Sequence, residues 1–234
     1  MKKLLISLTI LAVAATAALV AVADDDAVYS VNTVSVIKYT IPANGELTCI
    51  ALPVNPMDGG EWVFGQTDVA DQLAPGSLVY FWNGLGWDDY MKDPEDGSWV
   101  KGARNHTLVA GEAFFVRGPD NGAAQTIAVV GELPVDATVP YSVRGKNNLD
   151  VRGVTPYPVE GTFGTTSLST NLPAGSLVYF WNGLGWDDYM KDPEDGSWPK
   201  GARNHAYGIG EGIFIQAYGD VTSVDNDRPF DWQD

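Results

Sequence analysis

A block of 31 residues occurs twice in this chain with a single difference. Residues 76–106 and 175–205 agree at 30 of 31 positions, and the exception is Val100 against Pro199. Outside the block the similarity is weak, since across residues 36–56 only 3 of 21 positions match the second copy. Near-identity at a fixed spacing predicts two tandem copies of one structural unit.

The two copies divide the chain into repeat 1, residues 24–134, and repeat 2, residues 135–234. Weak similarity in the flanks fits a shared fold, because cores tolerate substitution when size and pattern are kept. Packing does not account for identical charged residues that we expect to be exposed, such as Asp88, Lys92 and Arg104. Two explanations stay open: recent exchange at the DNA level, or two copies of a surface that binds the same kind of partner.

The composition favours turn-rich β structure. The 234 residues include 26 Gly, 14 Pro, 8 Trp, 10 Tyr and 8 Phe, and 45% of the chain is hydrophobic. Runs of β-branched and aromatic residues alternate with turns, and Asn83-Gly84 between aromatic runs indicates a hairpin. In repeat 1 we expect strands at residues 34–41, 47–54, 78–82, 87–91, 113–117 and 126–133. The sequence therefore predicts an all-β fold of two tandem antiparallel sandwich-like or barrel-like repeats.

The N-terminus has the pattern of a secretory signal peptide. Lys2 and Lys3 precede an apolar stretch that ends in Ala21-Val22-Ala23, ahead of three aspartates. This pattern predicts a signal peptide over residues 1–23 that is cleaved after Ala23. The stretch is about long enough to span a bilayer, so an uncleaved anchor is the competing interpretation. Cleavage would place the mature chain outside the cell or on its surface, with no membrane attachment.

Charge and cysteine content limit the partners. The chain has 30 acidic and 14 basic residues, for a net charge of −16, which argues against nucleic acid and against an anionic membrane surface. Cys49 is the only cysteine, so the fold forms without an internal disulfide. It lies in an apolar run, which favours a small buried residue over an intermolecular bridge.

The end of repeat 2 is more polar than the end of repeat 1. Repeat 1 has the apolar run 126–133, whereas repeat 2 has the polar residues 220–227. A weak last strand predicts an open sheet edge, and open edges recruit strands from other chains. The mature N-terminus, residues 24–33, is a segment that could be donated to a neighbouring subunit. Alternatively, Phe230-Asp231-Trp232 folds back and covers the edge.

Each block carries the same set of aromatic residues. Strand alternation places Tyr80 and Trp82 on one face and Phe81 on the other, so one face must be core. The other face could stack on sugar rings or could form a subunit interface, and core packing of most of these rings is the simplest interpretation. The candidate interface or glycan-stacking residues are Tyr80, Trp82, Trp87, Tyr90, Trp99, Tyr179, Trp181, Trp186, Tyr189 and Trp198.

Acidic residues cluster beside each hairpin and are candidate calcium ligands, because calcium prefers carboxylate oxygens. The spacing does not match an EF-hand, and a solvated acidic turn is the alternative. No other cofactor is expected. The candidate calcium ligands are Asp88, Asp89, Asp93, Glu95, Asp96, Asp187, Asp188, Asp192, Glu194 and Asp195.

The sequence contains no recognisable catalytic set. His106 and His205 are the only histidines, and neither has a nearby second ligand for zinc. Asp88 and Asp89 are adjacent on a strand and point to opposite faces, so they cannot act as one acid/base pair. A hydrolase would need carboxylates that converge in a cleft from different loops. The block is acidic over 88–96 and basic at Lys101 and Arg104, which suits head-to-tail contact between copies, or else pairing within the chain.

Residues 111–116 read GEAFFV and residues 210–215 read GEGIFI, each after a turn-rich aromatic hairpin. These segments resemble a repeat of secreted β-rich proteins from environmental Gram-negative bacteria. The resemblance implies export and β structure only, and it carries no catalytic residues. We therefore expect a non-enzymatic exported structural protein, a subunit of an extracellular filament or cell-surface assembly built from copies of itself through strand edges. The alternative is a secreted glycan-binding protein that holds polysaccharide on the duplicated Trp and Tyr hairpins.

Overall fold

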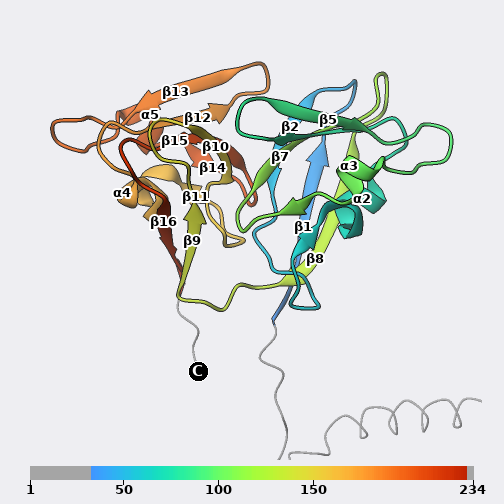
Figure 1. Cartoon of the computed structure of the whole chain (residues 1–234), viewed down its shortest axis with the longest axis horizontal. Helices are drawn as coiled ribbons and strands as arrows, with labels where there is room; N and C mark the ends of the chain where they lie inside the picture. The colour runs from blue at the N-terminus through green and yellow to red at the C-terminus, as the bar shows by residue number, and fades with distance from the viewer. Residues whose placement is uncertain (1–32, 231–234) are drawn as a thin grey trace, which may run out of the picture. The chain divides into compact units, whose positions relative to one another are not determined.

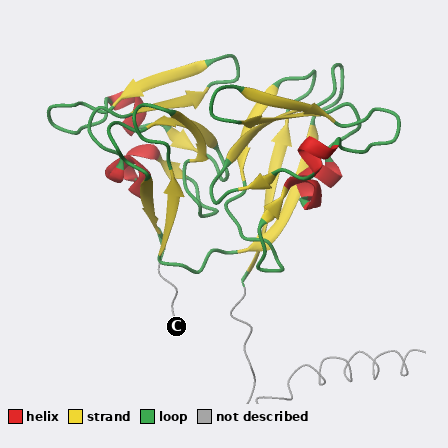
Figure 2. Ribbon diagram, viewed as in Figure 1, coloured by secondary structure: helices red, strands yellow, loops and turns green. Residues whose placement is uncertain are grey.

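The computed structural model describes residues 33–230, which form mainly strands, with only short helices between them (Figures 1 and 2). The all-β class and the tandem organisation predicted from the sequence are confirmed. The predicted signal peptide, residues 1–23, and all but the last residue of the candidate donor segment 24–33 lie outside the described residues. Within residues 33–230, no helix has both the length and the apolar character needed to span a bilayer.

Repeat 1 combines a four-stranded antiparallel sheet with a two-stranded ribbon and a shorter strand pair. The sheet has the order β2 (Leu47–Ala51), β7 (Ala113–Arg117), β4 (Leu78–Trp82) and β5 (Trp87–Met91). The ribbon pairs β1 (Val34–Ile41) with β8 (Gln125–Glu132), and the short pair joins β3 (Trp62–Val63) to β6 (Thr107–Leu108). The helical segments are η1 (Phe64–Gln66), α2 (Asp68–Gln72) and α3 (Lys101–Arg104).

Repeat 2 has the same elements in the same order. Its sheet has the order β10 (Leu149–Gly153), β15 (Gly212–Gln216), β12 (Leu177–Trp181) and β13 (Trp186–Met190). The ribbon pairs β9 (Thr138–Ser142) with β16 (Ser223–Asp227), and the short pair joins β11 (Gly161–Thr162) to β14 (Ala206–Tyr207). The helical segments are η2 (Phe163–Thr165), α4 (Ser167–Asn171) and α5 (Lys200–Arg203).

The expected open edge of repeat 2 is wrong, because the polar segment forms a strand. β16 pairs with β9 along five residues, in the place that β8 takes against β1 in repeat 1. Alternate residues face the core: Val224 is buried, and the side chain of buried Asn226 donates hydrogen bonds to the carbonyls of Val139 and Val224. The strand therefore pairs with β9 and directs two residues, Val224 and Asn226, to the core, although most of the segment is polar.

Each repeat has its own core between the four-stranded sheet and the ribbon. In repeat 1 the sheet contributes Val79, Phe81 and Phe114, and the ribbon contributes Ile127 and Val129. Repeat 2 has the corresponding cluster around Phe163, Phe180 and Ile213. Only one face of each four-stranded sheet packs in the core of its own repeat. The apolar residues on the other face must be covered by something else.

The predicted strands of repeat 1 are confirmed, and two of them differ in their bounds. The predicted strand 47–54 ends at Ala51, and the predicted strand 126–133 runs one residue earlier, over β8. The hairpin loop has four residues, and only Gly84 within it has a positive φ, of 103°. Asn83 stabilises this loop by accepting hydrogen bonds from the backbone N–H groups of Leu85 and Gly86 at 2.9 Å.

Candidate functional site

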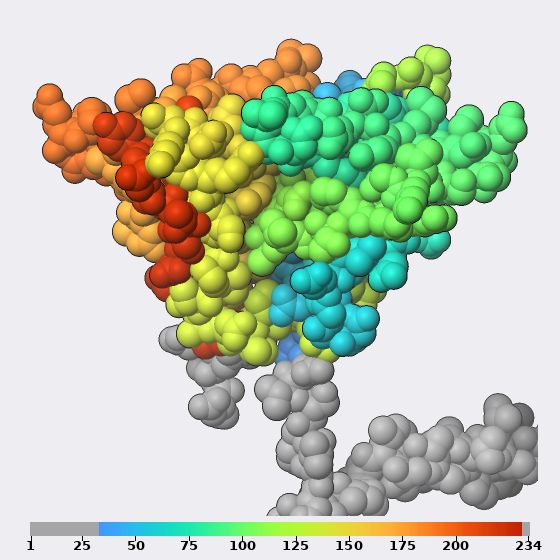
Figure 3. Space-filling view, viewed as in Figure 1, coloured from blue at the N-terminus to red at the C-terminus, as the bar shows by residue number. Residues whose placement is uncertain are grey.

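The second face of each four-stranded sheet is covered by the other repeat. A third apolar cluster joins Cys49, Ala51, Ala113 and Phe115 of repeat 1 to Val151 and Phe214 of repeat 2. Partly buried aromatic residues of both blocks surround it. We call this contact the inter-repeat interface. In Figure 3 the surfaces of the two repeats touch near the centre of the view.

The inter-repeat interface is reciprocal. The indole N–H of Trp82 donates a 2.8 Å hydrogen bond to the carbonyl of Leu149, and that of Trp181 donates a 3.1 Å bond to the carbonyl of Leu47. The ring of Trp82 packs edge-on against Phe214 with centroids 5.2 Å apart. The ring of Trp181 packs edge-on against Phe115 at the same distance. Each hairpin therefore inserts its tryptophan into the same place on the opposite repeat.

The structure separates the ten aromatic candidates into three groups. Six lie at the inter-repeat interface: Tyr80, Trp82, Trp87, Tyr179, Trp181 and Trp186. Trp99 and Trp198 are buried in the cores of their own repeats, and Tyr90 and Tyr189 pack against those cores. The six interface residues are partly buried, and the opposite repeat covers part of their rings.

Lys92 was expected to be exposed, and this expectation is wrong. The residue is 6% exposed. Its Nζ donates hydrogen bonds to the carbonyls of Ala70, Asp71 and Leu73 at the end of α2, at 2.8, 2.9 and 2.7 Å. Burial lowers the pKa of this amine, and the nearby Asp71 opposes the shift. The orphan carbonyls at a helix end need such donors, so the identity of Lys92 has a structural cause.

Repeat 2 repeats this arrangement in full. Nζ of Lys191 donates to the carbonyls of Ser169, Thr170 and Leu172, at distances between 2.7 and 3.0 Å. The indole N–H of Trp198 also donates to the carbonyl of Ser169, at 2.8 Å. The helix sequences differ between the repeats, DVADQ against SLSTN, whereas the lysine that binds their carbonyls is the same.

The acidic candidates are exposed, and several of them serve turns. Asp93 accepts hydrogen bonds from the backbone N–H groups of Glu95 and Asp96, and Asp96 accepts from that of Ser98. Asp88 accepts from the side chain of Asn83 at 2.8 Å. Hydrogen bonding by Ser98 lowers the pKa of Asp96. Across residues 33–230, no three His, Cys, Asp or Glu side chains are grouped to hold a metal, and calcium binding stays a prediction.

The two histidines have matching partners in the two repeats. His106 stacks on Phe81 with ring centroids 3.8 Å apart, and its Nε2 lies 2.9 Å from Oε1 of Glu112. The other oxygen of Glu112 accepts a hydrogen bond from the backbone N–H of Val109. His205 stacks on Phe180 and pairs with Glu211 in the same way, at 3.7 and 2.8 Å. Because the pairing occurs in both repeats, it is part of the shared fold.

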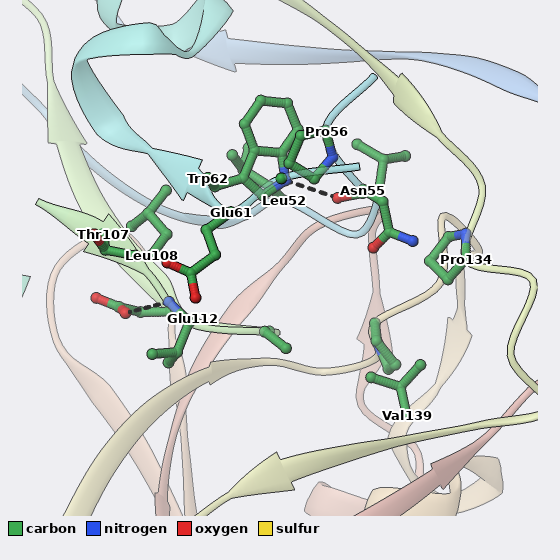
Figure 4. A pocket seen from close by; sticks show the side chains of 16 residues that line it. Leu52, Asn55, Pro56, Glu61, Trp62, Thr107, Leu108, Glu112, Pro134 and Val139 are labelled. Carbon is green, nitrogen blue, oxygen red and sulfur yellow. Dashed lines mark hydrogen bonds between the residues drawn. The ribbon is translucent and has the colours of Figure 1, made fainter. Parts of the chain in front are cut away.

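Sequence reasoning missed a cavity of about 350 Å³ that lies beside Trp62 (Figure 4). Its wall is mainly apolar and includes Leu52, Val54 and Leu108, together with residues 134, 139 and 156. Glu61 and Glu112 are the two carboxylates on this wall. Glu112 is hydrogen-bonded to the ring of His106 and to the backbone N–H of Val109.

This cavity depends on residues that differ between the repeats. Trp62 and Leu108 correspond to Gly161 and Tyr207, which pair with each other across β11 and β14. Tyr207 is 8% exposed, and its hydroxyl would lie 3.1 Å from a Cβ on Gly161. The tyrosine ring therefore occupies this region in repeat 2. The sequence signal for the cavity is the difference between the copies at Trp62 and Leu108.

Cys49 lies in the inter-repeat interface rather than within one core. It is 6% exposed, and burial raises the pKa of its thiol. The thiolate is the reactive form, so we expect iodoacetamide to alkylate the native chain at pH 8 at least roughly a hundredfold more slowly than the urea-unfolded chain. Mass spectrometry over a time course measures both rates. Equal rates in the two states would show that the interface is open in solution.

Comparison with known proteins gives no relative of this chain. No protein-family model, no curated protein and no solved structure matches the chain.

Proposed function

We propose that this chain is a non-enzymatic exported structural protein that assembles with copies of itself, outside the cell or on its surface. The observation that carries the proposal is a pair of unlike charged surfaces that occurs once in each repeat. One is the acidic outer strand of the sheet, β5 or β13, and the other is the basic helix α3 or α5. Both surfaces lie in the part of the sequence that the repeats share almost without change.

The acidic surface is a sheet edge. β5 is the last strand of its sheet, and among residues 33–230 no strand pairs with its outer side. Asp88 and Asp89 on this strand are both exposed, as are their counterparts on β13. Charges on an edge strand block pairing with arbitrary strands. A partner that brings positive charge to this edge would remove that block.

The basic surface supplies that charge. Lys101 and Arg104 on α3 are exposed, and so are Lys200 and Arg203 on α5. Within residues 33–230 none of these four side chains belongs to an ion pair. A contact between α3 of one copy and β5 or β13 of the next joins unlike surfaces, so it leaves both of them free at the ends of the array.

Negative-stain electron microscopy and light scattering of residues 24–234 test this proposal. We expect assemblies at low ionic strength that become fewer at 1 M salt, where screening acts within about 3 Å. The double change Lys101→Glu with Lys200→Glu should abolish them, and adding Asp89→Lys with Asp188→Lys should restore them. Lys38→Glu is the matched control, because Lys38 is exposed and lies outside the duplicated block. Particles of monomer size at every salt concentration, with or without calcium, would contradict the proposal.

A secreted glycan-binding protein is the second candidate, and the cavity beside Trp62 is the observation that favours it. The interface rings of the duplicated block are partly covered by the other repeat, whereas Trp62 lines a cavity. Trp62 is partly buried and donates its indole N–H to the carbonyl of Val54 at 2.8 Å, which holds the ring at the cavity wall. Retention on polysaccharide that Trp62→Ala removes, while the exposed hairpin changes Leu85→Ser with Leu184→Ser do not, would support this candidate.

A further inference from the structure

The inter-repeat interface contains a size difference between the two repeats. Repeat 2 has Gly153 and Gly212 where repeat 1 has Ala51 and Ala113. A Cβ on Gly153 would lie 2.9 Å from the Cβ of Ala51, and a Cβ on Gly212 would lie 2.7 Å from that of Ala113. Both distances are below ordinary contact. The missing methyl groups of repeat 2 are therefore what allows repeat 1 to approach.

This difference specifies which repeats can pair. A contact between two copies of repeat 1 would set Ala51 against Ala51 and Ala113 against Ala113, with no glycine to make room. Cys49 adds to the restriction, because a Cβ on Gly212 would overlap its Sγ. Tightly packed interfaces do not accept such extra methyl groups without shifts. The interface thus accommodates repeat 1 against repeat 2 and excludes a pair of two repeats 1.

The connection between the repeats is attached to repeat 1 before Pro134 and to repeat 2 after it. Leu133 is held by repeat 1, because its backbone N–H donates to the carbonyl of Thr33 at 2.8 Å. Val135 and Asp136 are held by repeat 2, because their carbonyls accept from Arg228 and from the hydroxyl of Tyr157. The ring of Pro134 fixes its own φ, so a separation of the repeats that keeps these bonds would use the other backbone torsions between Leu133 and Val135.

We propose that the inter-repeat interface also forms between chains, so that repeat 1 of one copy pairs with repeat 2 of another after a change in the backbone torsions between Leu133 and Val135. The proposal deepens the assembly proposed above, because it names the contact that links the copies. Closed and exchanged forms contain the same interface contacts, so the tether decides between them. A short tether corresponds to an effective concentration on the order of millimolar, and exchange therefore grows as the chain is concentrated.

The natural cysteine makes this exchange measurable. The change Gly212→Cys in residues 24–234 places a second thiol against Cys49 across the interface. Oxidation then joins one chain to itself in the closed form and joins two chains in the exchanged form. Non-reducing gels separate the two products. We expect the ratio of interchain to intrachain disulfide to rise about tenfold when the chain is concentrated tenfold before oxidation.

Two further variants keep the test decisive. Gly208→Cys lies in open space on the exposed surface of repeat 2, so it reports chance collisions and cannot give products larger than a dimer while Cys49 is buried. Because Gly212→Cys adds a Cβ that the interface does not accommodate, only products that a second pair also gives count as exchange: Ile50→Cys with Glu211→Cys in a Cys49→Ala background. These two residues face each other in an antiparallel bridge between the repeats.

The outcomes separate this proposal from the proposed function. Interchain products of both cysteine pairs that exceed those of Gly208→Cys support repeat exchange. Intrachain products alone at every concentration, including after refolding of the concentrated chain from urea, overturn it. If the microscope shows assemblies whose disulfides are all intrachain, exchange is refuted and self-assembly stands. If exchange stops at closed dimers and no larger particle forms, exchange stands and the structural function is refuted.

Discussion

Lys92→Met is expected to lower the free energy of unfolding by about 2–4 kcal/mol, although it replaces a charged side chain with an apolar one of similar length. The reason is that Nζ of Lys92 is the donor to three carbonyls at the end of α2. Methionine fills the space but donates nothing, so the carbonyls of Asp71 and Leu73 lose this donor, while that of Ala70 keeps the indole N–H of Trp99. Urea unfolding followed by circular dichroism measures the difference.

Two comparisons make this prediction specific. Lys191→Met removes the same three bonds in repeat 2 and should have an effect of similar size. Lys101→Met makes the same chemical change on an exposed helix residue of the same block and should stay within about 0.5 kcal/mol of the natural chain. An equally small effect for Lys92→Met would show that water replaces the lysine at the helix end.

Trp82→Ala with Trp181→Ala is expected to uncouple the two repeats. Each change removes a hydrogen bond to the opposite repeat and a ring that packs on Phe214 or Phe115. Truncating a buried aromatic residue costs about 3–5 kcal/mol, and these half-buried rings should lie near the lower figure. Each repeat keeps its own core, so unfolding should change from one transition to two.

Urea titration with circular dichroism distinguishes one transition from two. Leu85→Ser with Leu184→Ser is the matched control, because these hairpin residues are 97% and 98% exposed and belong to the same duplicated block. The control should leave a single transition. If the tryptophan variant also unfolds in a single transition of unchanged midpoint, the interface does not hold the repeats together in solution.

The near-identity of the two copies of the block has several structural causes, which do not extend to the exposed positions. Lys92, Trp99 and His106 serve the interior of their own repeat, and Trp82 and Trp87 serve the other repeat. These duties require the residue types but not identity at exposed positions. Leu85, Asp89, Glu95, Lys101 and Arg104 are exposed in both copies, and nothing in the described structure explains why they are the same.

The tandem organisation, the all-β class and most strand positions could be predicted from the sequence. These properties follow from local patterns: repetition at a fixed offset, alternation along strands and turn residues between them. Alternation also placed Tyr80 and Trp82 on one face and Phe81 on the other, as the structure confirms. Local patterns sufficed here because a strand's own side chains decide which of its residues share a face.

What covers each face of a sheet could be seen only in the tertiary structure. Alternation identifies an apolar face but not its partner, so the sequence left sugar, another subunit and the core open for rings that in fact meet the other repeat. Lys92 looked exposed because charge predicts solvent contact. It is buried because the carbonyls at the end of α2, 19 to 22 residues away in sequence, need its protons. The polar strand β16 and the cavity beside Trp62 likewise depend on residues far apart in the chain, and no local pattern contains that information.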